Sequence, residues 1–224
     1  MKNRCQPVAD SRYYNIEKTR FQNLIREGPN VVLDLGCGSG QLGKRLIELK
    51  RASEVVGAEI FEGAATNASK YYSKVIRGDI EHIEMPYREY FDYVLCGDIL
   101  EHLRDPWVTL QRVHGWLKKD GVLIASIPNV RYWRVLRDLV FMGRWEYVDS
   151  GIMDISHLRF FTRKSFGEAL ANSNYSIVRH EFWVNGKKQG FFNWMTFGLF
   201  REFLGSQFMV LAIKDNGIIH RSRK

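Results

Sequence analysis

The stretch from residue 31 to residue 47 constrains the fold of this chain more than any other. A short apolar run rich in β-branched residues, 31–35, is followed by three glycines at alternate positions and then by apolar residues at helical spacing after Gln41. This pattern predicts a strand, a tight turn and a helix in direct succession. Glycine has no Cβ, so its backbone can approach a ligand closely, and the helix that follows directs its first N–H groups and positive dipole end toward the turn. The stretch therefore predicts a binding site for a nucleotide-like ligand.

The glycines of this turn satisfy two motifs that imply different ligands. Gly38-Ser39-Gly40-Gln41-Leu42-Gly43 matches the dinucleotide pattern GxGxxG, which by itself does not decide the ligand. The fuller match is Asp34-x-Gly36-x-Gly38-x-Gly40, an acid two residues before the first of three alternating glycines. This motif resembles motif I of the class I S-adenosylmethionine (SAM) methyltransferases. The resemblance implies that Asp34 contacts the methionine amino end of SAM and that the turn packs against its methionine and ribose through Gly36, Cys37, Gly38 and Gly40.

Acidic residues also lie near the ends of the next two expected strands, 54–60 and 74–80. Glu59 suits a ribose, because one carboxylate can accept hydrogen bonds from both vicinal hydroxyls. A nicotinamide-dependent oxidoreductase would use the same acid, so this enzyme class remains an alternative. Gly78-Asp79-Ile80 resembles the GD(I/L) strand end of the methyltransferase family, whose acid accepts from the adenine amino group. Each acid alone could instead cap a helix or form a turn. The resemblance implies ribose contacts from Glu59 and Ile60 and adenine contacts from Asp79 and Ile80.

The order of the remaining elements predicts an α/β fold. Near-continuous apolar strands alternate with helices, a pattern typical of a parallel sheet with helices on both faces. With 224 residues and 45% hydrophobic content, the chain can bury one sizeable core, so residues 1–224 are expected to form a single domain. The resemblance implies the three-layer Rossmann-like methyltransferase fold, with a seven-stranded, mostly parallel sheet whose last strand is antiparallel. Strands are expected at 31–35, 54–60, 74–80, 91–96, 122–127, 176–184 and 207–214, and helices at 15–26, within an N-terminal helical segment 1–28, and at 106–117 and 163–171.

Composition narrows the compartment and the partners. Three cysteines without a CxxC spacing fit reduced thiols in a cytosolic protein, and no apolar leader follows residues 1–4. The longest nearly apolar run, 191–200, is too short to cross a bilayer, so a cytoplasmic protein is expected. The formal net charge of +8 favours anionic partners such as nucleic acid, a phosphorylated substrate or a lipid surface. Part of that charge belongs to a basic tail at 215–224, and a solvated tail is the favoured account of it.

The fourth expected strand, 91–96, and the residues after it carry the same family signal. Phe91-Asp92-Tyr93-Val94 and the segment 97–103 resemble the (F/Y)D(V/L)(I/V) strand and the (E)xxEHL-type segment of the methyltransferases. Ligands of open α/β sheets bind beyond the carboxyl ends of the strands, so the acids at those ends are expected to line one crevice. Gly97 and Asp98 thereby join the expected cofactor contacts. Tyr14 is a further one, because enzymes of similar layout often place an N-terminal aromatic residue over the cofactor.

Two carboxylates and two imidazoles form the candidate catalytic group. Asp98-Ile99-Leu100-Glu101-His102 and the distant His157 resemble the ExxEH…H constellation of small-RNA 2′-O-methyltransferases and some ubiquinone-pathway O-methyltransferases. The resemblance implies a divalent metal held by Asp98, Glu101, His102 and His157 beside the acceptor hydroxyl, although Asp98 stands where the family has a longer glutamate. Without a metal, His102 or His157 can serve as general base, since an imidazole titrates near pH ~6.5. A structural alternative is that Glu101 and His102 only cap and pack the turn after the strand.

Two later segments are candidates for selecting substrate and partners. Residues 128–160 are long for a connection and mix arginines with aromatic residues, which suits a lid over an anionic or sugar-containing substrate. A packed helix with a solvated arginine face is the alternative. Residues 185–206 are apolar around most of a helix circumference, so they are expected in the core, in a homodimer contact or on a membrane surface, the last two through 190–204. The candidate substrate contacts are Arg131, Tyr132, Trp133 and Trp145.

Together with the resemblance, these residues predict a SAM-dependent methyltransferase that methylates a hydroxyl of a small molecule. The stretch from His157 to Thr162 resembles the HxxxFT segment of methyltransferases from glycan and natural-product pathways, so a sugar or glycosylated metabolite is favoured. SAM supplies the activated methyl group, so the protein has to bind it, align it for in-line displacement and remove the hydroxyl proton. The alternatives are a phenol or quinone precursor, the less favoured ribose 2′-hydroxyl of RNA, and a SAM-fold binding protein without catalysis.

Overall fold

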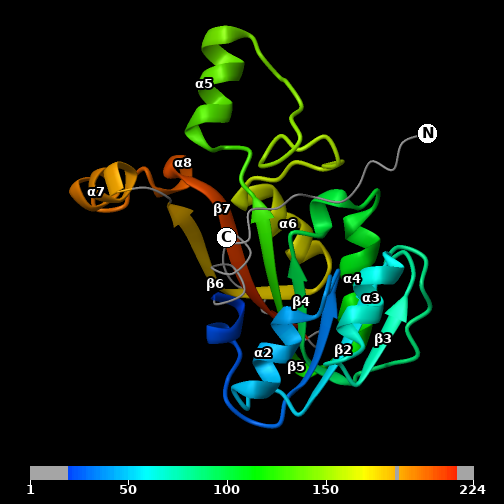
Figure 1. Cartoon of the computed structure of the whole chain (residues 1–224). Helices are drawn as coiled ribbons and strands as arrows, with labels where there is room; N and C mark the ends of the chain where they lie inside the picture. The colour runs from blue at the N-terminus through cyan, green and yellow to red at the C-terminus, as the bar shows by residue number, and fades with distance from the viewer. Residues whose placement is uncertain (1–19, 185–186, 216–224) are drawn as a thin grey trace, which may run out of the picture.

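Seven strands form one continuous sheet in this computed structural model, which describes residues 20–184 and 187–215 (Figure 1). Their order across the sheet is β3-β2-β1-β4-β5-β7-β6. β1 to β5 run parallel, and β7 runs antiparallel to both of its neighbours, β5 and β6. The predicted α/β class, with a mostly parallel sheet and an antiparallel last strand, is confirmed. The strands are β1 (Val31–Leu35), β2 (Glu54–Glu59), β3 (Lys74–Arg77), β4 (Phe91–Gly97), β5 (Leu117–Pro128), β6 (Tyr175–Val184) and β7 (Gly205–Lys214).

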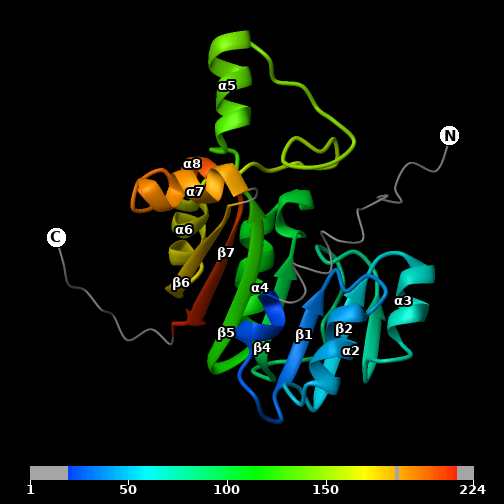
Figure 2. The ribbon, with the colours of Figure 1, turned by 60° about the vertical axis from the view of Figure 1, so that its left-hand side comes forward.

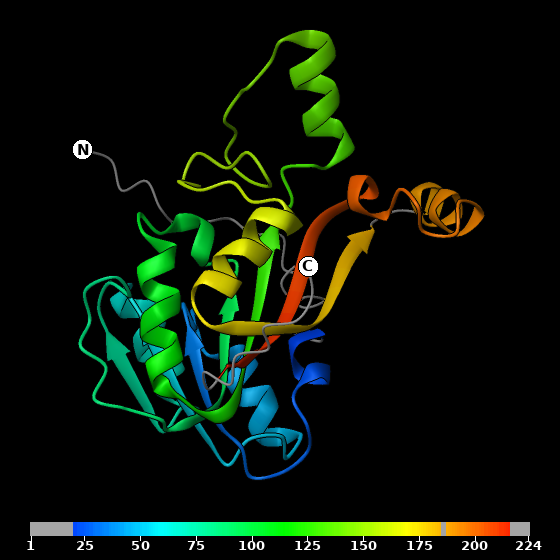
Figure 3. The same ribbon diagram turned by 180° about the vertical axis from the view of Figure 1, so that it is seen from behind.

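Helices cover both faces of the sheet, as the alternating pattern predicts. α4 and α6 lie against one face (Figure 3), where Leu110 and Phe166 are fully buried in one apolar cluster. α2 and the helical residues 20–24 lie against the other face (Figure 2), where Leu46 and Phe21 join a second buried cluster. The main helices are α2 (Gln41–Glu48), α3 (Glu62–Ala68), the 3-10 turn η1 (Leu100–His102), α4 (Pro106–Trp116), α5 (Trp133–Met142), α6 (Arg163–Asn172), α7 (Lys187–Met195) and α8 (Arg201–Leu204).

Two of these helices begin where the sequence supplies a cap. The Asp105 carboxylate accepts a hydrogen bond from the Val108 N–H at 3.0 Å, and Pro106 follows at the first helical position of α4. At α6, the Thr162 hydroxyl accepts from the Ser165 N–H at 3.1 Å, and the Ser165 hydroxyl accepts from the Thr162 N–H at 3.0 Å. Thr162 and Ser165 thus form a capping box at the start of α6.

Several predicted boundaries are wrong, each for a local reason. β3 ends at Arg77 rather than at residue 80, because Gly78 takes φ 153° and the chain turns there. β5 begins five residues early, since Leu117 already pairs with Phe91 and the expected turn at 118–121 is an irregularity inside the strand. The helix expected at 15–26 lies partly outside the described residues, and its described part ends at residue 24.

Two segments lie beyond the edge at which the parallel strands end. α5 stands away from the sheet at the top of Figure 1, and none of its residues is buried, so the predicted packed helix is wrong. The apolar segment 185–206 was expected as helical, and its described residues 187–204 form α7, a turn at 196–200 and α8, while β7 begins at Gly205. The core placement of this segment is also wrong, because Trp194 is 73% and Phe197 100% exposed. Both segments therefore leave large apolar side chains facing water.

Candidate active site

The turn after β1 has the backbone conformation that its glycines predict. Gly36, Gly38 and Gly40 take φ values of 69°, 54° and 79°, in the left-handed region that other residues rarely adopt. At Gly40 the contact is also close, because a Cβ there would lie 2.7 Å from the Ala68 Cα. The turn leads directly into α2, whose N-cap is Gly40. The positive end of the α2 dipole is thus directed at the space beyond β1.

Asp34 lies under this turn and is held by a residue that the sequence analysis missed. Its carboxylate is 5% exposed and accepts a hydrogen bond from the Tyr72 hydroxyl at 2.6 Å. The same hydroxyl accepts from the Gly43 N–H at 3.0 Å. Burial, reinforced by the Asp34 charge, raises the pKa of Tyr72 well above its usual value, so the hydroxyl stays a donor to the carboxylate.

Two glycines in the sequence indicate the position of Tyr72, although their meaning becomes clear only once the fold is known. A Cβ at Gly43 would lie 2.2 Å from the Tyr72 ring, and one at Gly57 would lie 2.8 Å from it. A glycine inside α2 and a glycine inside β2 both weaken their elements unless something approaches closely. These two glycines together mark the place of a large neighbouring side chain.

Glu59 ends β2 and faces the same turn. The carboxylate is 6% exposed and accepts from the Gly38 N–H at 2.8 Å through Oε2 and from the Phe61 N–H at 2.9 Å through Oε1. These bonds fix its position directly beside the glycines. Ile60, the other expected ribose contact, is about half exposed at the same strand end.

Asp79 follows β3 and lies one strand further out. Its carboxylate accepts from the Glu81 N–H at 2.9 Å and lies 3.0 Å from His82 Nδ1. The Glu81 hydrogen bond and then His82 hold the pKa of Asp79 below its usual range. These contacts form a turn next to the Glu59 strand end. The side chain of Ile80 is buried in the apolar cluster of the α4 face.

β4 ends at Gly97, and Asp98, which follows it, is held by side chains of the adjacent strand β5 and of β7 beyond it. Asp98 takes φ 46°, and its N–H donates to the Ser126 hydroxyl of β5 at 3.0 Å. Its carboxylate accepts from that hydroxyl, also at 3.0 Å, and from the Gln207 amide of β7. β1 and β4 are adjacent in the sheet while their connections run to opposite sides, which is the switch point at which α/β sheets bind ligands.

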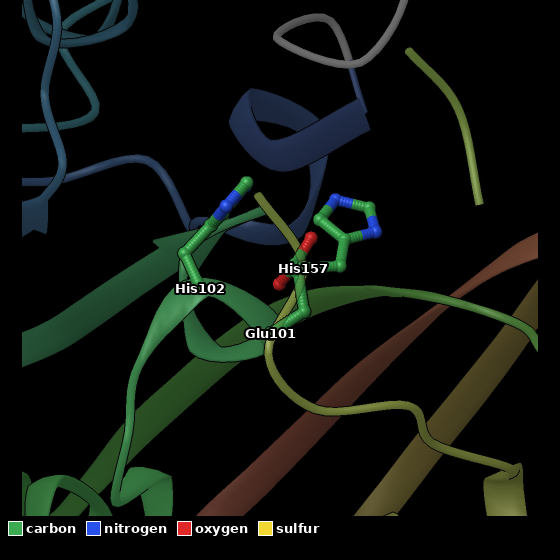
Figure 4. A group of neighbouring side chains, drawn as sticks. All are labelled: Glu101, His102 and His157. Carbon is green, nitrogen blue, oxygen red and sulfur yellow. The ribbon is translucent and has the colours of Figure 1, made fainter. Parts of the chain in front are cut away.

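Glu101, His102 and His157 come together beyond the end of β4 (Figure 4). One potential ligand atom from each lies within 4.8 Å of the others, and the two imidazole rings are 4.7 Å apart at their centroids. Glu101 is 1% exposed and His157 is buried. The Glu101 carbonyl accepts from the Leu158 and Arg159 N–H groups, at 2.8 and 3.0 Å, which joins η1 to the loop that carries His157. Asp98 is not part of this group, so the expected four-residue set is reduced to three.

Both histidines contact backbone carbonyls through Nδ1. His102 Nδ1 lies 3.2 Å from the Ser156 carbonyl, and His157 Nδ1 lies 2.9 Å from the Ile152 carbonyl. A neutral imidazole that donates through Nδ1 presents Nε2 as an acceptor. Burial, followed by the neighbouring His157, lowers the pKa of His102 below 6.5, so this ring is neutral near pH 7. The pair can therefore accept a proton or bind a cation through Nε2.

An aromatic wall stands next to the histidines. The Phe160 ring lies 6.5 Å from His157, and the Trp145 ring lies 5.4 Å from Phe160. Tyr147 adds a third ring, 6.1 Å from Phe160. Of the residues expected to contact substrate, Trp145 is the one that this wall contains, and Phe160 and Tyr147 were missed.

The other expected substrate contacts lie elsewhere. Arg131 pairs with Glu202 at 2.7 Å and covers the Phe203 ring, so its charge is already matched. Trp133, whose ring is 6.1 Å from that of Tyr132, lines a groove between α5 and α8. Tyr14, the expected aromatic cover of the cofactor, lies outside the described residues.

Comparison with known proteins gives matches over most of the chain. A family model described as a methyltransferase domain matches residues 9–180. An O-methyltransferase of ubiquinone biosynthesis from Ruegeria pomeroyi is 34% identical over 109 residues, 44% of this chain and 41% of the relative. The chain spans about two fifths of the length of the first curated relatives it matches. A protein of the same name from Histophilus somni is 28% identical over 77% of this chain and 81% of its own length.

Solved structures share the fold across nearly the whole chain. The crystal structure of a SAM-dependent methyltransferase from Archaeoglobus fulgidus superposes with a TM-score of 0.66, at 18% identity, over 92% of this chain and 100% of that one.

In the described part of the chain, no helix combines the length and the hydropathy that crossing a membrane requires.

Proposed function

Because the chain belongs to the class I SAM-dependent methyltransferase family, we propose that it transfers the SAM methyl group to a hydroxyl oxygen of a small molecule. The observation that carries this proposal is the histidine pair, which lies beyond the end of β4 while the glycine turn lies beyond β1, the neighbouring strand. A cofactor over the glycine turn would direct its reactive end toward the next strand end of the switch point. This arrangement supports the proposal that the methyl group and the acceptor hydroxyl meet between the ends of β1 and β4.

Cofactor binding is assigned to three strand ends. Asp34 would meet the methionine amino group, because a buried carboxylate gains most from an opposite charge. Glu59 would accept from the ribose hydroxyls, and Asp79 from the adenine amino group. Gly36, Gly38 and Gly40 would allow the backbone to approach the methionine and ribose.

The transfer step needs alignment and a proton acceptor. A lone pair of the acceptor hydroxyl forms a bond to the methyl carbon while the carbon–sulfur bond breaks and its electrons return to sulfur. The products are a methyl ether and S-adenosylhomocysteine, and the hydroxyl proton passes to a base. His102 is the residue proposed for this role, because it is neutral near pH 7 and its Nε2 is the acceptor nitrogen. His157 is the second candidate for the general base.

A divalent cation is an alternative to the histidine base. One carboxylate and two imidazoles are a suitable donor set for a borderline divalent metal, and both imidazoles have the Nδ1 contacts to carbonyls that commonly orient histidine ligands. Glu101, His102 and His157 would hold the ion, without Asp98. When bound there, it would lower the pKa of the acceptor hydroxyl.

The acceptor class follows from the aromatic wall and the relatives. Trp145 and Phe160 offer ring faces on which a sugar or a phenol can stack. A sugar or glycosylated metabolite remains the favoured acceptor, and a phenol of quinone type is the second candidate. The second is favoured by relatives named for ubiquinone biosynthesis.

Calorimetry with SAM, S-adenosylhomocysteine and NAD tests the cofactor first. Binding of SAM and S-adenosylhomocysteine without NAD is expected, and tight NAD binding without SAM binding would overturn the assignment. Release of S-adenosylhomocysteine with a panel of sugar and phenol acceptors then tests the reaction class. Binding of SAM with no turnover on any hydroxyl acceptor would favour a SAM-fold binding protein instead.

A further inference from the structure

A band of exposed apolar side chains crosses two segments that are far apart in the sequence. Both segments lie beyond the edge of the sheet at which the parallel strands end (Figures 1 and 2). Phe141 of α5 is 84% exposed, and Leu199 after α7 is 78% exposed. We call this band the apolar face; it consists of Val140, Phe141, Met142, Phe191, Trp194, Met195, Phe197 and Leu199, all more than half exposed.

A groove lies between α5 and the residues that directly follow the second part of the apolar face. It encloses about 450 Å³ and is lined by Trp133, Leu136, Val140 and Phe141 of α5 together with Phe200 and Phe203. Its walls are almost entirely apolar. An isolated helix as short as α5 is marginal in water, and α5 buries none of its residues in the described part of the chain. The face and groove therefore have the character of an interaction surface.

The base of this surface is rigid. The Asn129 side-chain amide donates to the carbonyls of Glu202 and Gly205, at 2.7 and 2.8 Å, and Asn129 is 1% exposed. The Glu202 carboxylate in turn pairs with Arg131 and with Arg163, at 2.7 and 2.5 Å. These contacts tie α8 to the end of β5 and to α6. The groove side of the surface, formed by α8, is thus anchored to the body of the fold.

The tip of the face has an unusual backbone. Phe197 takes φ 50°, and the Gly198 N–H donates back to the Asn193 carbonyl at 2.8 Å, as at a helix end that usually places glycine in the left-handed position. Here that position holds a phenylalanine whose ring is fully exposed. A left-handed phenylalanine is unfavourable for the free chain, so the observed tip points to a function for the exposed ring.

The charges around the face are mostly basic. The segments 131–147 and 187–204 contain seven basic residues and three acids. Two of the acids, Asp138 and Glu202, are paired with arginines. Arg134 and Arg144 are exposed and have no carboxylate partner within residues 20–184 and 187–215. The apolar face thus has a positively charged rim.

From this charge pattern we propose that the apolar face docks on an anionic lipid membrane. Exposed aromatic and aliphatic side chains with a basic rim match the interface of such a membrane, in which rings enter the headgroup region and arginines meet lipid phosphates. A second copy of the chain fits less well, because a two-fold contact through this face would place two basic rims against each other. The docking does not depend on the proposed reaction.

Vesicle flotation of the full chain tests the proposal. Binding is expected to vesicles of phosphatidylcholine mixed with phosphatidylglycerol, to weaken as salt rises, and to be weak on phosphatidylcholine alone. Phe197→Ser with Leu199→Ser should reduce binding about tenfold. Arg134→Gln with Arg144→Gln should reduce it about tenfold on the anionic vesicles only. Ile47→Ser with Val108→Ser, at exposed apolar positions of α2 and α4, is the matched control and should bind like the native chain.

Circular dichroism establishes that each variant folds, which is expected because all the substituted side chains are exposed. Light scattering at the same concentrations reports the oligomeric state. Absence of binding by the native chain to anionic vesicles overturns the proposal, as does unchanged binding by the Phe197 and Leu199 variant. A dimer that this variant dissociates, with no vesicle binding, would instead assign the face to a second copy.

Discussion

Tyr72→Phe removes one hydroxyl from beneath the glycine turn after β1, while the ring that fills the surrounding space remains. The hydroxyl donates to Asp34 at 2.6 Å and accepts from the Gly43 N–H at 3.0 Å. The ring itself occupies the space left by Gly43 and Gly57, and phenylalanine fills that space equally. No cavity forms, so the substitution isolates the two hydrogen bonds.

The expected loss of stability follows from those two bonds. A hydrogen bond to a charged group contributes ~1.5–3 kcal/mol, and a buried donor left without an acceptor costs ~1–3 kcal/mol. The freed Asp34 carboxylate and Gly43 N–H can partly relax toward each other or toward water. We therefore expect the free energy of unfolding to fall by ~2–4 kcal/mol, less than the sum of the two contributions. For a chain of this size that corresponds to a fall in Tm of ~5–15 °C.

Urea unfolding followed by circular dichroism measures the change in the free energy of unfolding. An unchanged m value would show that the substitution altered stability and not the surface exposed on unfolding. A double-mutant cycle with Asp34→Asn should give a coupling energy of ~1–3 kcal/mol, because the two side chains share one bond. Tyr71→Phe is the matched control, since the neighbouring ring is 37% exposed and its loss of a hydroxyl should be nearly neutral. A change below ~0.5 kcal/mol for Tyr72→Phe, or no coupling to Asp34, would refute the reasoning.

Three further predictions concern the cofactor and the proton acceptor. Glu59→Ala should weaken SAM binding by ~1.5–3 kcal/mol in calorimetry, and it should also lower stability, because the Gly38 and Phe61 N–H groups lose their acceptor; unchanged affinity would remove Glu59 from the site. If His102 is the base, kcat/KM should stay level down to the usual imidazole pKa of 6.5 and fall only at lower pH. The unfolded chain then binds more protons than the folded one, so stability should also fall below pH ~6.5; a loss of activity beginning above pH ~7 would contradict the assignment. EDTA should leave turnover intact if the base is a histidine, whereas loss of turnover restored by Mg²⁺, Mn²⁺ or Zn²⁺ would establish the metal alternative, and full turnover in both His102→Ala and His157→Ala would exclude the histidine base.

The part of the site that could be predicted from the sequence consists of short-range patterns. Asp34 and the three glycines lie within one turn of chain, and Glu59 lies at the end of its own apolar strand. Such patterns reflect backbone conformations that only certain residues allow, so they can be recognised in the sequence without knowledge of the fold. The succession of strands and helices along the chain followed from the same kind of signal, and the antiparallel direction of the last strand followed from the family resemblance.

The contacts that hold the site could not be predicted, because they join distant positions. Tyr72 and Asp34 are 38 residues apart, and Gln207 and Asp98 are 109 residues apart. Neither pair has a local pattern that distinguishes it from other polar or aromatic residues. Asp98 was expected in a metal group from the resemblance to the ExxEH…H constellation, whereas its carboxylate is held by Ser126 and Gln207.

The apolar segment 185–206 shows a second limit of prediction from the sequence. Its composition correctly indicated an unusual surface, but periodicity alone did not separate core from surface. The fold decides the matter, because α2, α4 and α6 pack against the faces of the sheet, whereas α7 lies beyond its end and leaves its apolar side chains exposed.

The position of β7 has a consequence for synthesis of the chain. β7 is the last strand in sequence, yet it lies between β5 and β6, and its Gln207 completes the clamp on Asp98. A ribosome must therefore release residues 205–214 before β6 can join the sheet. Until then β5, with its apolar Ile124 and Ala125, is an open edge that can pair with other chains. Nascent chains of this protein thus pass through an aggregation-prone stage, which ends when β7 pairs with β5 and covers that edge.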